Sequence, residues 1–299
     1  MSWIVLSVMA AAFQTLRFTL QKHLSMGALS AGGATLARFV YTAPFVTLLA
    51  LVYLLWLGEG LPSVGPRFVL YVLSGGVTQI LATWCVVAIF ASRNFAVGIT
   101  FKKTEVMLTA LVGFVVLGDR VSLGGMGAIG LGLVGVLVLS DLAGGTGGLL
   151  RRAMNPAAGL GLLSGILFAC SAVAYRGATL EVWAADPLLR ALVTMPCVTI
   201  FQAFALGGYL RWREAGEISR VLASWRTSVW MGLAGMGGSI CWFTAFAMMN
   251  AAYVFAVGQV EVIFSIMVSV WFFGEVITRR EWVGMGLISL SVLGLVWLS

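Results

Sequence analysis

The chain has 299 residues, of which 61% are hydrophobic and 10% are charged, and its formal net charge is +7. A soluble domain has about 25% charged residues, so the composition excludes a soluble fold and predicts an integral membrane protein. The basic residues are scattered through loops and apolar segments, which favours a role in membrane topology and excludes nucleic acid as a partner.

Most of the chain falls into apolar segments of about 18–25 residues, the length with which a helix crosses about 30 Å of hydrocarbon. No basic residue precedes the first segment, and Gln14 and Arg17 interrupt it, so we predict a retained span and not a cleavable signal. Ten membrane helices are predicted, over 3–21, 31–57, 67–92, 94–117, 123–140, 156–180, 187–210, 227–248, 250–273 and 280–298.

A repeat relates the fourth and ninth of these segments. Shifting the sequence by 156 positions places 94–122 on 250–278, so that Glu105 coincides with Glu261. Each copy is an apolar run that carries a glutamate partway along and ends in glycine followed by a carboxylate. Two carboxylates at equivalent places inside apolar runs are candidates for function, because intramembrane charges are costly and usually face a cavity or a partner.

Weaker matches extend the repeat over the chain and predict an all-α membrane protein built from two five-helix repeats. We place the repeats at 1–141 and 156–299, with a glycine-rich connecting loop at 142–155. An odd number of crossings in each repeat inverts the second one in the membrane. Inverted repeats of this kind are typical of secondary transporters, whose site lies near the midplane between the halves.

Lys and Arg residues concentrate in the loops after the first, third, fifth, seventh and ninth predicted helices. The positive-inside rule predicts that these loops are cytoplasmic and that both termini lie outside.

Two segments resemble the drug/metabolite transporter superfamily, in particular its proteins with tandem EamA-type domains. They are FVVLGDRVSLGGMGAIGLGLVGVLVL at 114–139 and WFFGEVITRREWVGMGLISLSVLGLVWL at 271–298. The resemblance covers nearly the whole chain and implies ten helices around a central cavity, alternating access, and export or exchange of small metabolites, amino acids or drug-like compounds. It also implies cytoplasmic termini, against the charge count. The chain departs from the family where many such domains have proline, because Glu105 and Glu261 stand there.

Two lysines precede the first glutamate. Lys102 and Glu105 are three residues apart, on one face of a helix, where they can neutralise each other. Lys103 points about 100° away from them. It either contributes to a binding site or extends outward to the headgroups.

Glu261 has no basic residue within one turn of its own helix. It therefore either pairs across the cavity with Lys102, Lys103 or Arg38, or stays protonated. Burial disfavours the charged form of a carboxyl group, so coupling to protons at Glu261 or Glu105 is one alternative and a structural lock between helices is the other.

Polar and aromatic side chains in the other apolar segments complete the candidate site. Arg17 and Arg176 fall at corresponding places in the two halves, and a guanidinium can bind a carboxylate through two hydrogen bonds. The candidate substrate-binding residues are Gln14, Arg17, Gln79, Trp84, Lys103, Tyr175, Arg176, Trp242 and Gln259. The candidate coupling or charge-pair residues are Lys102, Glu105, Glu261 and Arg38.

No catalytic, metal-binding or cofactor-binding pattern is present in the sequence. His23 is the only histidine, and the four cysteines show no CxxC spacing. We therefore expect no enzyme activity and no cofactor. Glycines in 123–140 and 280–298 permit close helix packing, within one chain or between two copies, so a monomer and a homodimer both remain open.

These observations predict a transporter of the inner membrane whose partners are a small-molecule substrate, the lipid bilayer and, in one alternative, protons. Basic residues outnumber acidic ones in the apolar segments, which favours amino acids or similar carboxylate-bearing compounds as cargo. A flippase or translocation subunit for lipid or lipid-linked sugar, and a multidrug exporter of the same fold, are the alternatives.

Overall fold

A computed structural model describes residues 2–25, 27, 29–58, 60–90, 102–140, 156–264, 267 and 279–298. Within these ranges the regular elements are all helices. They are α1 (Ser2–Ser25), α2 (Ala31–Leu57), α3 (Phe68–Phe90), α5 (Glu105–Leu117), α6 (Leu123–Ser140), α8 (Pro156–Leu180), α9 (Pro187–Arg213), α10 (Glu217–Ala223), α11 (Trp225–Met248), α12 (Ala251–Gly258) and α14 (Arg279–Leu298).

The described residues include six helices that are long and apolar enough to cross a membrane, and four shorter apolar ones. Large apolar side chains cover much of their outer surface, with Leu55 81% and Trp56 76% exposed. Such a surface is unfavourable in water and favourable against lipid tails. The chain is therefore a multi-pass membrane protein.

Local sequence sets where these helices begin and end. Ser30 accepts a hydrogen bond from the Gly33 amide at the start of α2, and Gly58 ends that helix in the left-handed region with φ 66°. Asp186 caps α9 in the same way through the Leu188 amide. The predicted spans 31–57, 123–140 and 156–180 coincide with α2, α6 and α8.

Two predicted spans are interrupted. The described part of 94–117 has Lys102 in a helix, a turn at 103–104, and α5 from Glu105 onward. The span 250–273 has the same form, because α12 gives way to a turn at 259–260 and helical structure resumes at Glu261. Residues 94–101 and most of 265–273 lie outside the described residues, as does the predicted connecting loop at 142–155.

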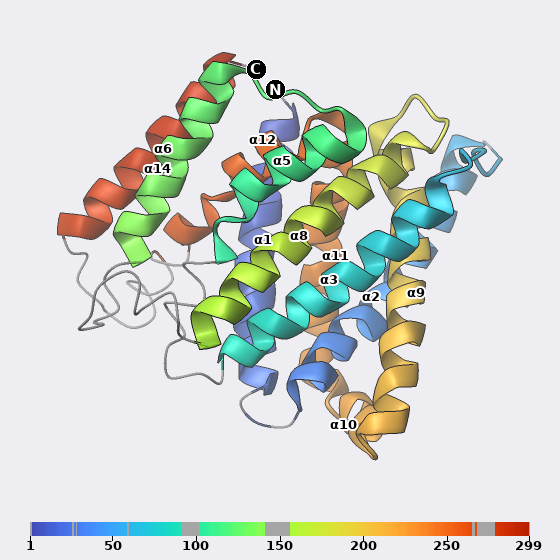
Figure 1. Cartoon of the computed structure of the whole chain (residues 1–299). Coiled ribbons are helices and arrows are strands. Elements are labelled where there is room, and N and C mark those ends of the chain that lie inside the picture. Colours follow the sequence, from blue (N-terminus) through green and yellow to red (C-terminus); the bar gives the residue numbers. More distant parts are fainter. Residues whose placement is uncertain are drawn as a thin grey trace.

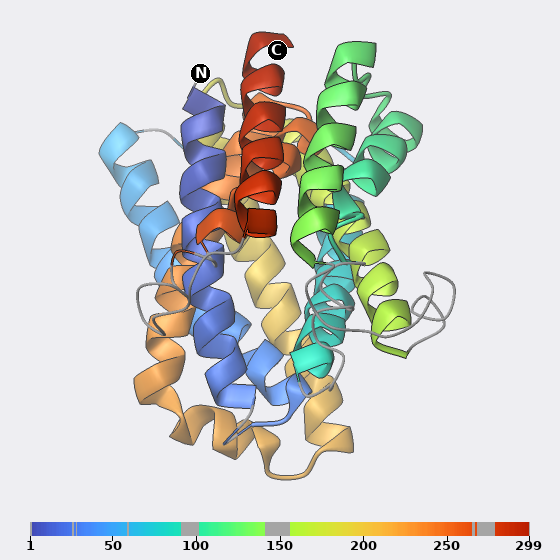
Figure 2. The ribbon, with the colours of Figure 1, turned by 90° about the vertical axis from the view of Figure 1, so that its left-hand side faces the viewer.

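The helices pack in pairs that join the two halves of the chain. In Figure 1, α3 lies along α8, and α6 lies along α14 at one side of the molecule. Extensive contacts also join α1 to α11 and α2 to α9. Figure 2 shows both chain ends at the same end of the molecule, opposite the short helix α10.

Glycine allows the close approach of α6 and α14, as the sequence indicated. A Cβ atom at Gly135 would lie 2.9 Å from the carbonyl oxygen of Gly284 and 2.9 Å from the Cβ atom of Leu287. A larger residue at position 135 would push these helices apart.

Candidate functional site

The site forms where the two interrupted helices meet α1, α8 and α11. The turn at 103–104 and the turn at 259–260 are 156 residues apart, which is the offset of the sequence repeat. Each break is followed directly by a glutamate at the start of a helical segment, Glu105 in the first half and Glu261 in the second. The repeat thus places two carboxylates at equivalent positions beside irregular backbone.

Lys102 and Glu105 form the pair expected from their spacing. The Lys102 Nζ atom lies 3.1 Å from Glu105 Oε1, and both side chains are buried. The Lys102 ammonium also lies 5.0 Å from the centre of the Phe168 ring and 5.7 Å from that of Phe18. Aromatic faces stabilise a buried cation, so α1 and α8 both contribute to holding this pair.

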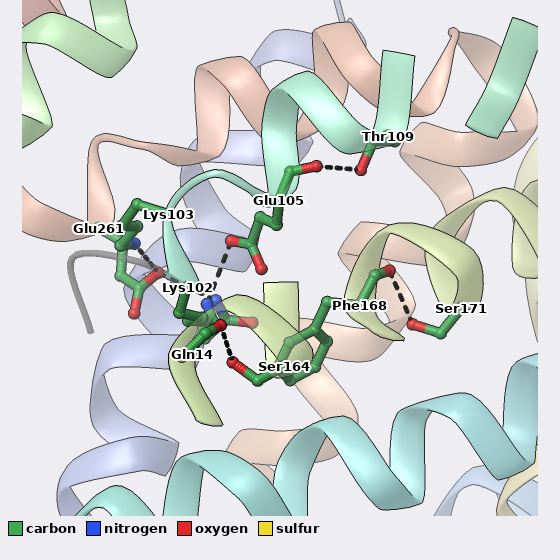
Figure 3. Close-up of polar contacts among 10 residues, drawn as sticks. Gln14, Lys102, Lys103, Glu105, Thr109, Ser164, Phe168, Ser171 and Glu261 are labelled. Atoms are coloured by element: carbon green, nitrogen blue, oxygen red, sulfur yellow. Dashed lines mark hydrogen bonds and ion pairs between the residues drawn. The ribbon is translucent and has the colours of Figure 1, made fainter. Parts of the chain in front are cut away.

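Lys103 turns toward the second half of the chain and binds Glu261. Its Nζ atom donates to Glu261 Oε2 at 3.0 Å, and the Gln14 Nε2 atom donates to the same oxygen at 3.0 Å. Figure 3 shows the two lysines with their carboxylates, one pair across the turn at 103–104, the other between the halves. Lys103 is 4% exposed, so the alternative in which it extends to the headgroups is wrong.

These charged groups line a narrow cavity with a volume of about 20 Å³. Its wall joins the four ion-paired side chains to aromatic and amide groups. The lining residues are Gln14, Lys102, Lys103, Glu105, Phe168, Trp242, Phe255, Gly258, Gln259 and Glu261. The charges of two cations and two carboxylates cancel in this cavity, which limits the free-energy cost of burying them. The Oε1 atom of Gln259 has no hydrogen-bond partner among the described residues.

Arg17 and Arg38 lie beside each other, next to Gly235 of α11. A Cβ atom at Gly235 of α11 would lie 3.4 Å from Arg17 Cδ and 3.6 Å from Arg38 Cγ. Arg17 donates to Gln21 Oε1 at 2.9 Å, and its guanidinium lies 4.0 Å from the centre of the Phe18 ring. The Phe18 ring therefore lies close to both Arg17 and Lys102.

Gln79 and Tyr175 belong to a second polar group that includes Gln202 of α9. The Tyr175 hydroxyl donates to Gln79 Oε1 at 2.9 Å, and Gln202 Nε2 donates to the same atom at 2.9 Å. The Tyr175 ring stacks on Phe243 with 4.5 Å between ring centroids. Gln79 and Gln202 line a second cavity together with Arg38. This cavity shares no lining residue with the first.

Four candidate residues lie outside the lining of both cavities: Arg17, Tyr175, Arg176 and Trp84. Arg176 binds Asp119 through two hydrogen bonds of 2.7 and 3.0 Å, and also donates to the carbonyl oxygens of Phe246 and Met249. Trp84 packs edge-on against Tyr209 with 5.6 Å between ring centroids. A substrate-binding role for Arg176 or Trp84 stays a prediction.

Sequence reasoning missed several residues at these sites, among them Phe18, Phe168 and Gln202. A glutamine in an apolar membrane segment is itself a signal of function, and it could have singled out Gln202. The two phenylalanines carry no comparable signal, because aromatic residues are common throughout these helices. Groups of three or more His, Cys, Asp or Glu residues suited to a metal ion do not occur within the described ranges.

Residues 155–297 match the EamA-like transporter family. A solved structure described as "Crystal structure of protein" has a TM-score of 0.65 and 17% identity, covering 97% of this chain and 99% of its own. At an identity this low, the match shows that the two proteins share a fold over almost their whole length. It does not show that they share a function. The comparison with curated proteins gives no match. The second half of the chain is thus an EamA-like transporter domain of the drug/metabolite transporter superfamily, a group that moves small molecules across membranes.

Proposed function

We propose that the chain is a secondary transporter that exports or exchanges small metabolites across the inner membrane by alternating access. Amino acids or similar carboxylate-bearing compounds are the cargo that best matches the charges around its first cavity. The EamA-like domain supports transport of small molecules. The observation that carries the finer proposal is the Lys103–Glu261 ion pair, which joins the two interrupted helices beside the cavity.

The helix contacts support two inverted repeats. The contact of α3 with α8 has its counterpart in that of α11 with α1, and the contact of α3 with α9 in that of α11 with α2. Two other large contacts, α2 with α9 and α6 with α14, pair a helix with its own counterpart. Exchanging the two halves therefore maps these contacts onto one another. Five crossings in each half would give the inverted pair, which rocks around a site at its centre.

An amino acid matches the charges of the first cavity. Its carboxylate can take the place of Glu261 beside Lys103, and its ammonium group can pair with the carboxylate that is released. The zwitterion thus exchanges one buried ion pair within the protein for two pairs with the ligand, and the cavity stays neutral. Because Lys103 and Glu261 belong to different halves, this exchange loosens a link between them, which is what alternating access requires.

The test is counterflow in proteoliposomes with a panel of amino acids, organic acids and cationic drugs. We expect saturable exchange of carboxylate-bearing compounds, reduced at least tenfold in Lys103→Met. A matched control is Gly127→Ala in α6, where an added Cβ meets no atom within 4 Å. Absence of saturable exchange for every compound would refute the transporter proposal, and accumulation of lipid alone would favour the flippase alternative.

Proton coupling is tested on the same preparation. If Glu261 is the coupling group, Glu261→Gln will abolish proton movement that accompanies substrate exchange. Unchanged proton movement in this variant would refute the coupling role and leave Glu261 as the partner of Lys103.

A further inference from the structure

Two neighbouring arginines carry buried charge without a carboxylate beside them. Arg17 is 3% exposed and Arg38 is 7% exposed. Within the described ranges no carboxylate oxygen lies within 4.0 Å of either guanidinium. Glu261 attracts Arg17 from farther away, but its carboxylate already binds Lys103. A buried charge without a close counterion is costly, so this pair of cations favours a bound anion.

Hydrogen bonds to other described residues use few of the donors of these two arginines. A guanidinium has five N–H donors. In the part of the chain that the structure describes, Arg17 donates to Gln21 Oε1 at 2.9 Å, and Arg38 donates to Thr83 Oγ1 at 3.4 Å. Arg176, by contrast, makes four hydrogen bonds, two of them to a carboxylate. Because buried donors usually have a partner, Arg17 and Arg38 have donors left for a ligand.

The second cavity lies against Arg38. Its volume is about 10 Å³, close to the smallest that holds one water molecule. An organic substrate is therefore excluded, and a single water molecule or a monatomic ion fits. Arg38 is the one charged residue among the described residues that line this cavity. A lone cation in the wall favours a small anion as the occupant.

Ser239 of α11 brings a second donor to the same wall. Its side chain is 9% exposed, and its hydroxyl makes no hydrogen bond to another described residue. The other two hydroxyls of the wall are already engaged, because Thr42 donates to the Gly232 carbonyl at 3.0 Å and Thr199 donates to the Met195 carbonyl at 2.9 Å. The Ser239 proton is therefore available to an anion beside Arg38.

We propose that the second cavity binds a single chloride ion. The Arg38 guanidinium and the Ser239 hydroxyl donate hydrogen bonds to it, and Arg17 attracts it over a longer distance. Chloride is slightly larger than water, and the flexible Met195 side chain in the wall can adjust to it. The ion cancels one of the two buried charges. The inference goes beyond the proposed function, since this cavity is separate from the Lys103–Glu261 pair.

The test measures binding of radioactive chloride to the purified full chain in nanodiscs of uncharged phospholipid. Sodium gluconate keeps the ionic strength constant, and empty nanodiscs give the background. We expect saturable binding of about one ion per chain, with competition by bromide and none by gluconate, which is too large for the cavity. Arg38→Gln should abolish binding. Ser239→Ala removes one hydrogen bond to a charged ligand and should weaken binding about tenfold.

The matched control is Ser7→Ala in α1. The Ser7 hydroxyl is buried too, but it donates to the Trp3 carbonyl of its own helix, so chloride affinity should not change.

Absence of saturable chloride binding to the unaltered protein would overturn the proposal, because the cavity would then hold water alone. Unchanged affinity in folded Ser239→Ala protein would also overturn it, by placing the ion elsewhere. This second criterion still decides if Arg38→Gln fails to fold. Binding is measured without transport, so failure of the counterflow experiment and failure of this inference give different results.

Discussion

The two helix breaks have the same backbone form and different side chains. In each, a helical residue is followed by a two-residue turn and then by a glutamate that starts the next helical segment. The first break carries Lys102 and Lys103, and the second carries Gly258 and Gln259. Both cations of the cavity therefore come from the first half, and the second half contributes a carboxylate and an amide. The repeat fixes where polar groups can enter the bilayer, and the differences between its copies decide what those groups bind.

The largest effect should come from removing the cation that joins the two breaks. Lys103→Met takes away the cation 3.0 Å from Glu261 and should lower the free energy of unfolding by about 3–5 kcal/mol. Thermal unfolding in detergent measures this. The double variant Lys103→Met/Glu261→Gln removes both charges and should recover most of the loss. A double variant no more stable than the single one would show that the ion pair does not explain the effect.

A smaller effect should follow from adding a side chain at Gly258, beside the second break. A Cβ atom at Gly258 would overlap Cη2 of Trp242, whose ring stacks on Phe246 and packs edge-on against Phe255. Gly258→Ala should therefore cost about 1–3 kcal/mol of stability, since the indole has little room to move. It should also reduce the exchange of amino acids in the counterflow assay. Gly286→Ala in α14, where the Cβ meets no atom within 4 Å, is the control and should be near neutral.

The smallest effect concerns the amide that shares Glu261 with Lys103. Gln14→Leu removes one hydrogen bond of 3.0 Å and should cost about 1 kcal/mol, with a weaker affinity for cargo of about two- to tenfold. Thr47→Val is the control, because the Thr47 hydroxyl bonds only to the Ala43 carbonyl within α2 among the residues that the structure describes. Counterflow at varied substrate concentration measures the affinity for cargo and so distinguishes Gln14→Leu from the Thr47→Val control. An unchanged affinity in Gln14→Leu would place this amide outside the binding step.

The sequence alone predicted most helix positions, because the length of an apolar segment is tied to the thickness of the bilayer. It also predicted the Lys102–Glu105 pair, which depends only on a spacing of three residues. The breaks at 103–104 and 259–260 were missed, since apolar composition continues across them. The seven-residue helix α10 was missed as well, although Glu217 and Arg220 in it are spaced to pair.

Contacts between distant segments were the part that sequence could not decide. Three basic residues were open as partners for Glu261, and only the packing of α12 against α5 and α1 selects Lys103. Arg176 was grouped with Arg17 because of its place in the repeat, yet its partner is Asp119, which follows α5. Which carboxylate a buried arginine binds depends on the helix opposite, and a repeat in the sequence does not specify that helix.

The Arg176 contacts have a mechanical consequence for α5. One guanidinium holds Asp119, directly after the left-handed Gly118 that ends α5, together with two carbonyl oxygens at the end of α11. The anchored end of α5 thus acts as a pivot, and the opposite end carries Glu105. Thirteen residues at 1.5 Å each make an arm of about 20 Å, so a tilt of about 10° would displace Glu105 by about 3 Å. A small rotation at Arg176 would be enough to separate Glu105 from Lys102 at the cavity.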